Sequence, residues 1–181
     1  GRLRGILRRF GCAFRCDPQV EALLRAAARD RENLAQRLGA EVPSPTASPP
    51  GLARPLTPFQ QRDIDQLAAM RHGANFSVPG AGKTSVTYAL HALEREAGRV
   101  DKMLVVGPLS AFSAWEEESG ATLAEPLTVG RWDSHGGRTD VTLLNYQRLR
   151  SEFGAVAAWM GRHSVHLVVD EAHRAKRGLR G

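Results

Sequence analysis

The sequence predicts an α/β domain with a mostly parallel sheet and helices on both faces. Short, continuous apolar runs, such as the four residues 103–106, are typical of strands buried on both sides. Segments with helical spacing of apolar residues alternate with these runs, which favours strand–helix–strand units. A glycine-rich turn joins one apolar run to the next helix. The 181 residues suffice for one such domain with an appendage.

The first segment is expected to be an Arg-rich helical extension over residues 1–41. Asp17 and Pro18 are typical of a helix start, and Gly39 of a helix end. The first forty residues hold 9 Arg against 4 acidic residues, a net charge of +5 (9 − 4). Residues 42–53 are rich in Pro and Ser and read as a linker. The main domain is then expected over residues 54–181.

Within the main domain, helices and strands are predicted in alternation. Thr57 and Gln60 have the spacing of a capping box, which opens the first helix. The predicted helices cover residues 57–71, 83–96, 109–118 and 147–160. The predicted strands cover residues 75–78, 103–106, 127–132, 141–144 and 166–169. Gly98 stops the second helix, and His72-Gly73 the first.

The turn between residues 75–78 and the following helix has the composition of a phosphate-binding loop. Glycines at 80 and 82 let backbone N–H groups converge on an anion, and the helix start adds its positive end. Lys83 can reach the β- and γ-phosphates, and the hydroxyl of Thr84 can ligate Mg²⁺. Ser77 stands where the pattern Gly-x-x-x-x-Gly-Lys-Ser/Thr has its first glycine. The alternative is an ordinary Gly-rich turn. The residues expected to bind the nucleotide are Gln60, Pro79, Gly80, Ala81, Gly82, Lys83, Thr84 and Ser85.

Asp170 and Glu171 follow the last predicted strand. Ligands of parallel sheets collect at the carboxyl ends of the strands, so this pair is expected at the same edge as the glycine loop. Asp170 would hold Mg²⁺ through water, and Glu171 would orient and deprotonate an attacking water. Lys83, Asp170 and Glu171 are therefore the expected catalytic residues, and Thr84 and Asp170 the expected metal ligands. A plain strand-end cap is the alternative.

Composition limits the other functional classes. The formal net charge of +6 and the pI of about 10.1 favour an acidic partner such as nucleic acid. Cys12 and Cys16 form no disulfide framework and no convincing zinc site, so free thiols are expected. No apolar run approaches the roughly 20 residues of a membrane span. A cytoplasmic location is the default, and the chain reads as a fragment of a longer protein.

With these motifs in place, the sequence resembles the first RecA-like domain of superfamily 2 DEAD/DEAH helicases. Gly-Ala-Gly-Lys-Thr and the later Asp-Glu-Ala-His carry this resemblance. RPLTPFQ (54–60) is similar to the Q motif of that family. LVVGPLSAFSAWEEE (104–118) and VTLLNYQRLR (141–150) resemble the Ia and Ib segments of its Swi/Snf-like double-stranded DNA translocases. The similarity covers about residues 54–177.

The resemblance implies a RecA-like P-loop NTPase fold, ATP and Mg²⁺ as cofactors, and movement along nucleic acid, double-stranded DNA ahead of RNA. Gln60 would read the adenine edge, and His173 would couple the ATP and nucleic-acid sites. Ser110 and Asn145 would contact nucleic acid. A second RecA-like domain in the same chain would supply an arginine finger, so these 181 residues alone should bind ATP–Mg²⁺ weakly with almost no turnover.

Structural alternatives remain open for several residues. The Gln60 side chain can act only in the capping box, and Ser110 only as a helix N-cap. Trp115 can act only in core packing, and His173 can be a solvated loop residue. Two other functions also remain open: the motor subunit of a restriction-type translocase, and a non-catalytic nucleotide-binding scaffold. The four residues Lys83, Thr84, Asp170 and Glu171 together speak against a scaffold, which needs no water-activating glutamate.

Overall fold

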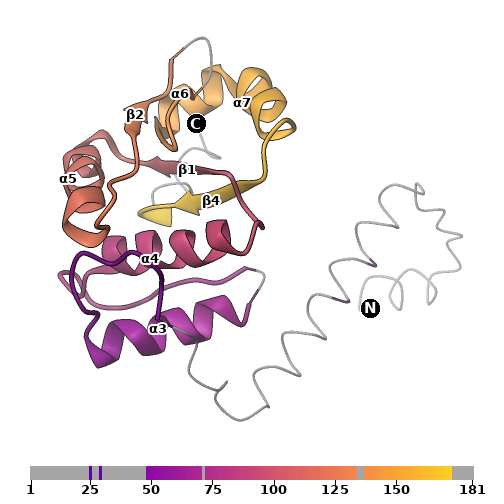
Figure 1. The fold of residues 1–181 in the computed structure, drawn as a ribbon. Coiled ribbons are helices and arrows are strands. Elements are labelled where there is room, and N and C mark those ends of the chain that lie inside the picture. Colours follow the sequence, from indigo (N-terminus) through magenta and orange to yellow (C-terminus); the bar gives the residue numbers. More distant parts are fainter. Residues whose placement is uncertain (1–24, 26–28, 30–47, 71, 134–136, 173–181) are drawn as a thin grey trace, which may run out of the picture. The chain divides into compact units, whose positions relative to one another are not determined.

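The computed structural model describes residues 25, 29, 48–70, 72–133 and 137–172 (Figure 1). The chain divides into two units, Gly1–Val42 and Pro43–Gly181. In the first unit, Arg25 and Arg29 are helical, and Arg29 Nε donates to Arg25 O over 3.4 Å. The rest of the predicted N-terminal helix lies outside the described residues, as do Cys12 and Cys16. The second unit is described below.

A four-stranded, fully parallel sheet forms the centre of the second unit, in the order β2-β3-β1-β4. Its strands are β1 (Lys102–Gly107), β2 (Val129–Arg131), β3 (Val141–Asn145) and β4 (Val165–Val169). Val106 pairs with Leu144 on one side and with Val169 on the other. The predicted fold class is confirmed as α/β with a parallel sheet, an arrangement consistent with a RecA-like domain.

Each face of the sheet is covered by its own helices. Met103 and Val105 of β1 pack against α4 (Lys83–Glu96) and α5 (Phe112–Thr122). Leu104 and Val106, pointing the other way, pack toward α6 (Tyr146–Ser151) and α7 (Phe153–Met160). Figure 1 shows α4 on one side of the sheet and α6 and α7 on the other. Because all four β1 residues are buried, each contributes roughly 1.5–3 kcal/mol of transfer free energy.

Helix α3 (Pro58–Ala68) forms a further layer on α4. Ile64 of α3 packs against Val86 and Ala89 of α4. The predicted capping box is confirmed: the Gln60 amide N–H donates to Thr57 Oγ1 over 3.3 Å, and the Thr57 N–H donates to Gln60 Oε1 over 3.0 Å. The helix ends at Ala68, three residues before the predicted end.

The predicted strand over residues 75–78 is wrong. The Asn75 side-chain amide and the Ser77 hydroxyl both donate to Asp63 Oδ2, over 3.0 and 2.8 Å, and the Ser77 N–H donates to Asn75 Oδ1 over 2.8 Å. These local bonds to side chains replace strand pairing, as Asn and Ser commonly allow. Phe76 is therefore 93% exposed rather than buried in the sheet.

Two predicted helices are interrupted. A 3₁₀ turn, Leu109–Ala111, precedes α5, which itself extends to Thr122. The helix predicted over residues 147–160 is divided at Glu152, whose φ of −113° and ψ of 20° leave the helical region. The Glu152 carboxylate accepts hydrogen bonds from Trp132 Nε1 and Arg148 Nε, which hold it at this break.

Part of the predicted linker packs against the second unit's core. Leu52 forms a bridge with Leu123 and packs against the core. The Ala53 N–H donates to Thr122 O over 2.9 Å, and the Ala124 N–H donates to Gly51 O over 2.8 Å. These bonds tie the segment before Arg54 to the end of α5, so the ordered domain starts before residue 54. The other predicted boundaries stay predictions.

Within the described residues, the sheet has two edge strands, β2 and β4. Strand β4 pairs only with β1. Leu167 and Val169 lie on the face of α6 and α7 but are 48% and 47% exposed, because those helices cover β1 and β3 instead.

Candidate functional site

Two glycines give the turn before α4 its shape. Gly80 has φ 82° and Gly82 has φ 77°, in the left-handed region that costs other residues about 1–2 kcal/mol. A Cβ on Gly82 would lie 2.4 Å from Gln60 Nε2. Gln60 Nε2 also donates to Ala81 O over 3.4 Å, so Gln60 packs directly against the turn. The positive φ thus favours glycine at position 82, and a Cβ there would displace the Gln60 amide.

The start of α4 is suited to an anion. Gly82 is the N-cap and supplies no side-chain hydrogen bond to the helix. The first N–H groups of a helix have no partner within the helix, and they carry the positive end of its dipole. Lys83 Nζ donates to Ser77 O over 2.8 Å and to Val78 O over 3.2 Å, so its ammonium lies across the turn. This arrangement fits a phosphate group.

Asp170 lies directly after β4 and is held by three groups. Its N–H donates to Val106 O over 2.8 Å. Trp115 Nε1 donates to Asp170 Oδ2 over 3.0 Å, and the Tyr146 hydroxyl donates to the Asp170 carbonyl oxygen. A Cβ on Gly107 would lie 3.2 Å from the Asp170 Cβ, so the Asp170 side chain starts beside the glycine that ends β1.

Glu171 has a strained backbone. Its φ of 53° is the only positive value for a non-glycine residue in the described part of the chain. Such conformations cost about 1–2 kcal/mol and concentrate at functional sites. Glu171 is exposed, and its functional role stays a prediction.

The turn and the acidic pair belong to the same end of the sheet. In Figure 1 the arrowheads of β1 and β4 point toward the side on which α4 begins. Side chains link the two motifs: the Tyr88 hydroxyl of α4 donates to Trp115 O over 2.7 Å, and the Trp115 indole donates to Asp170. Carboxylate and hydroxyl oxygens are the ligands that Mg²⁺ prefers. Asp170 and Thr84 carry oxygen atoms of this kind, and their binding of one metal stays a prediction.

Ser85 is held by side chains outside the turn. It is buried, its hydroxyl donates to Glu118 Oε1 over 2.6 Å, and it accepts from an Arg54 guanidinium N–H over 2.9 Å. Thr122 Oγ1 also donates to Glu118 Oε1, over 3.0 Å. Arg54 and Glu118 form an ion pair as well. We name Arg54, Ser85, Glu118 and Thr122 the Glu118 cluster. Ser85 thus joins α4 to α5, a role that sequence reasoning missed.

The residues expected at nucleic acid have mixed outcomes. Asn145 is the N-cap of α6, and its Oδ1 accepts from the Arg148 N–H over 2.7 Å. Ser110 is exposed within the 3₁₀ turn and caps neither that turn, which Pro108 precedes, nor α5, which Ala111 precedes. His173 lies outside the described residues. The functional roles of all three stay predictions.

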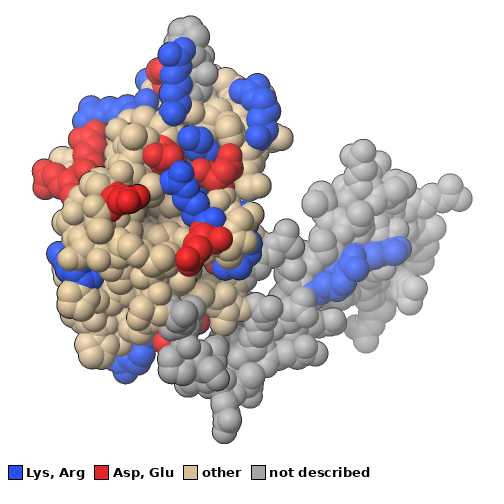
Figure 2. Space-filling view, in the orientation of Figure 1, with Lys and Arg blue, Asp and Glu red and all other residues tan. Residues whose placement is uncertain are grey.

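The net charge of residues 48–172 is slightly negative, whereas that of the whole sequence is positive. Residues 48–172 contain 12 Lys and Arg against 14 Asp and Glu. Figure 2 shows both signs interspersed on one face. The basic excess therefore comes from residues 1–40 and from the four basic residues at 174–180. Among the helices that the structure describes, none has the length and apolar character needed to cross a bilayer.

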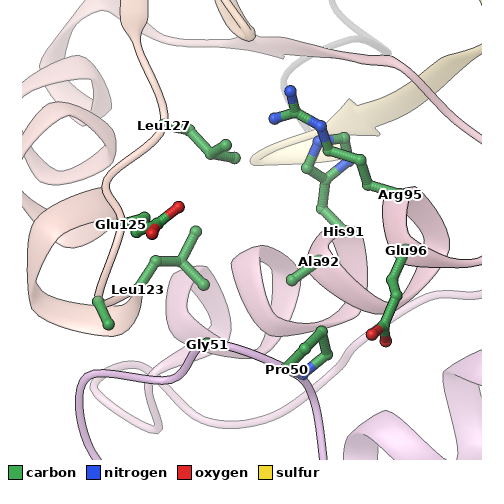
Figure 3. Close-up of a pocket in the computed structure, with 10 residues that line it drawn as sticks. Pro50, Gly51, His91, Ala92, Arg95, Glu96, Leu123, Glu125 and Leu127 are labelled. Atoms are coloured by element: carbon green, nitrogen blue, oxygen red, sulfur yellow. The ribbon is translucent and has the colours of Figure 1, made fainter.

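A separate hollow of about 400 Å³ lies near the far end of α4 from the turn (Figure 3). His91, Ala92 and Arg95 line it from α4, opposite Leu123 and Leu127. His91 is 0% exposed, and neither ring nitrogen has a hydrogen-bond partner in the described part of the chain. Its ring stacks on His166 of β4 at 5.5 Å. This hollow is not part of the proposed phosphate site.

Comparison with known protein families and with curated proteins finds no match. Among solved structures, the Sulfolobus solfataricus SWI2/SNF2 ATPase core in complex with double-stranded DNA is similar, with a TM-score of 0.48 and 16% sequence identity. The similarity covers 72% of this chain and 34% of that chain, so the present chain spans about a third of its length. A likeness this coarse assigns no role to individual residues.

Proposed function

We propose that this chain is an ATP-binding domain of a nucleic-acid-dependent ATPase of the helicase or translocase kind. One observation supports this most. The Gly80–Gly82 turn opens an uncapped helix at the sheet end where β4 terminates in Asp170 and the strained Glu171. A phosphate-binding turn and a carboxylate pair at the same end of a sheet fit metal-assisted phosphoryl transfer.

Each residue then has a defined task. The backbone amides at the start of α4 hold the phosphates, and Lys83 exchanges the carbonyl oxygens of Ser77 and Val78 for phosphate oxygens. The Thr84 hydroxyl and Asp170 hold Mg²⁺, and Glu171 orients the attacking water. When bound, Mg²⁺–ATP supplies the transferable phosphoryl group.

Gln60 is proposed to contact the base while bracing the turn. Its Oε1 is engaged by the Thr57 N–H and its Nε2 by Ala81 O, so adenine recognition would exchange one of these bonds. Double-stranded DNA is the proposed partner, and a second RecA-like domain in the same chain the proposed source of an arginine finger. Because that finger is worth roughly 10³–10⁵ in rate, we expect almost no turnover from these 181 residues alone.

Nucleotide binding tests the proposal directly. We expect Lys83→Ala to weaken Mg²⁺–ATP binding by about 10- to 100-fold, since a charge-assisted hydrogen bond is worth about 1.5–3 kcal/mol. Lys102→Ala is the matched control, because Lys102 lies 3.9 Å from Asp140 at the opposite end of β1. Equilibrium binding of a fluorescent ATP analogue measures both. Equal affinity of the two variants would refute a phosphate site at this turn.

Hydrolysis separates a motor from a binding module. In the protein carrying the proposed second domain, Glu171→Gln should abolish DNA-stimulated phosphate release while ATP binding persists. Unchanged release would remove Glu171 from the mechanism. Binding without any hydrolysis in the wild type would favour a nucleotide-dependent scaffold.

A further inference from the structure

We propose that Trp115 and Tyr146 are positioning residues for the metal carboxylate, and that Trp115 sets the orientation of Asp170 toward Mg²⁺. This inference rests on the proposed function. Its starting observation is that two aromatic side chains from different helices hydrogen-bond the same residue, Asp170. Trp115 Nε1 donates to Oδ2 over 3.0 Å, and the Tyr146 hydroxyl donates to the backbone carbonyl oxygen.

The Trp115 indole is fixed before it meets the carboxylate. It is 3% exposed and packs with Tyr88 at a ring distance of 5.5 Å. The Tyr88 hydroxyl also donates to the Trp115 carbonyl oxygen over 2.7 Å. Tyr88 comes from α4, the helix that begins at Lys83. The phosphate-binding helix and the metal carboxylate are therefore joined through one side chain of α5.

The hydrogen bond from Trp115 gives the two carboxylate oxygens of Asp170 different roles. Oδ2 is occupied by Trp115, and within the described residues no group donates to Oδ1. Gly107 lies beside this side chain and leaves room for it, since a Cβ at position 107 would lie 3.2 Å from the Asp170 Cβ. Oδ1 is thereby left as the atom for the metal-bound water. Groups that orient a ligating carboxylate typically change metal affinity or activity 10- to 100-fold when removed.

Tyr146 anchors the same residue from the other face of the sheet. It packs in the cluster of α6 and α7 beside Leu144, immediately after the α6 N-cap Asn145. Asp170 is thus held on one side by the 104–118 segment and on the other by the 141–150 segment. A shift of α5 or α6 would be transmitted directly to the metal carboxylate, which gives a physical route for a partner bound at either segment to alter the ATP site.

The test compares two tryptophans. Trp115→Phe removes the N–H bonded to Asp170, and Trp132→Phe removes a similar N–H bonded to Glu152 over 2.6 Å, in an equally buried indole on the opposite face. ATP affinity is measured with Mg²⁺ and with EDTA. We expect Trp115→Phe to lower the Mg²⁺-dependent gain in affinity about 10- to 100-fold with unchanged affinity in EDTA. Trp132→Phe should leave both affinities unchanged.

A double-mutant cycle and a spectroscopic readout complete the experiment. If Trp115 acts through Asp170, Trp115→Phe adds little to Asp170→Asn in the Mg²⁺-dependent gain. In the wild type labelled with 5-fluorotryptophan, Mg²⁺ added to the ATP-bound chain should shift the ¹⁹F resonance of Trp115 and not that of Trp132. This decides the matter even if Trp115→Phe fails to fold.

Two failures are distinguishable. The positioning role alone is overturned if the wild type binds Mg²⁺–ATP but Trp115→Phe has the same ATP affinities as Trp132→Phe. It is also overturned if the Trp115 resonance does not shift when Mg²⁺ is added. A wild type that binds no Mg²⁺–ATP overturns the proposed function and this inference with it.

Discussion

Acid sensitivity centred on His91 is the prediction that the structure specifies most fully. Burial lowers the pKa of His91 from 6.5 to about 4, with further lowering from His166 and Arg95 and an opposing effect of Asp140 and Glu94. His166 comes from β4, and its own pKa is lowered, chiefly by burial. The imidazole of His91 is therefore neutral in the folded chain at neutral pH.

The sign and size follow from linkage. Because the folded pKa lies below the unfolded value, the unfolded chain takes up the proton first as pH falls. Stability is therefore lost between about pH 6.5 and about pH 4, and is unaffected by this group above that window. A shift of this size corresponds to about 3 kcal/mol in full, of which about 2 kcal/mol is lost by pH 5.

The assay is urea unfolding followed by circular dichroism at about pH 8 and about pH 5. The wild type should lose about 2 kcal/mol more stability between these values than His91→Phe. Phenylalanine removes both unpaired ring nitrogens, and the adjacent hollow of about 400 Å³ accepts its slightly larger ring. His72→Asn, at an exposed position, is the control for loss of a histidine. An equal acid loss in His91→Phe and wild type would refute the reasoning.

Two further substitutions test the turn and the contact between α4 and α5. Gly82→Ala should weaken ATP binding, because the new Cβ displaces the Gln60 amide that contacts Ala81 in the turn. Gly98→Ala, with a similar φ of 67° and open space around it, should cost stability but leave binding intact. The same fluorescent-analogue titration measures both. Glu118→Ala should lower the free energy of unfolding by about 1–3 kcal/mol, since it strips the buried donors of their acceptor. Glu117→Ala, at an exposed neighbouring position, should change the urea midpoint little.

Local patterns in the sequence predicted the sheet and the turn well. The apolar runs at 103–106, 141–144 and 166–169 became strands with ends shifted by about one residue, and the helix over 83–96 was predicted at its observed limits. These elements depend on runs of mainly apolar residues and on glycines that form turns or end helices. Both features involve neighbouring positions in the sequence, which is why these elements could be predicted from it.

The errors share a different cause. Phe76 and Val78 suggested a strand, but Asp63 binds the neighbouring polar side chains, and that competition depends on a helix twelve residues away. The hydrogen bond between Trp115 and Asp170 spans 55 positions. Spacing rules can identify Trp115 as a core residue, but they cannot identify which polar group its indole N–H meets.

The bare flank of β4 has a consequence for how the chain behaves in solution. In the described part of the chain, β4 pairs with one strand only, and its Leu167 and Val169 side chains are half-exposed. Such an edge is a template for pairing with an extended segment of another molecule. Concentrated preparations should therefore aggregate through pairing of their β4 edge strands. Leu167→Lys should reduce this aggregation, as charged residues do on natural edge strands.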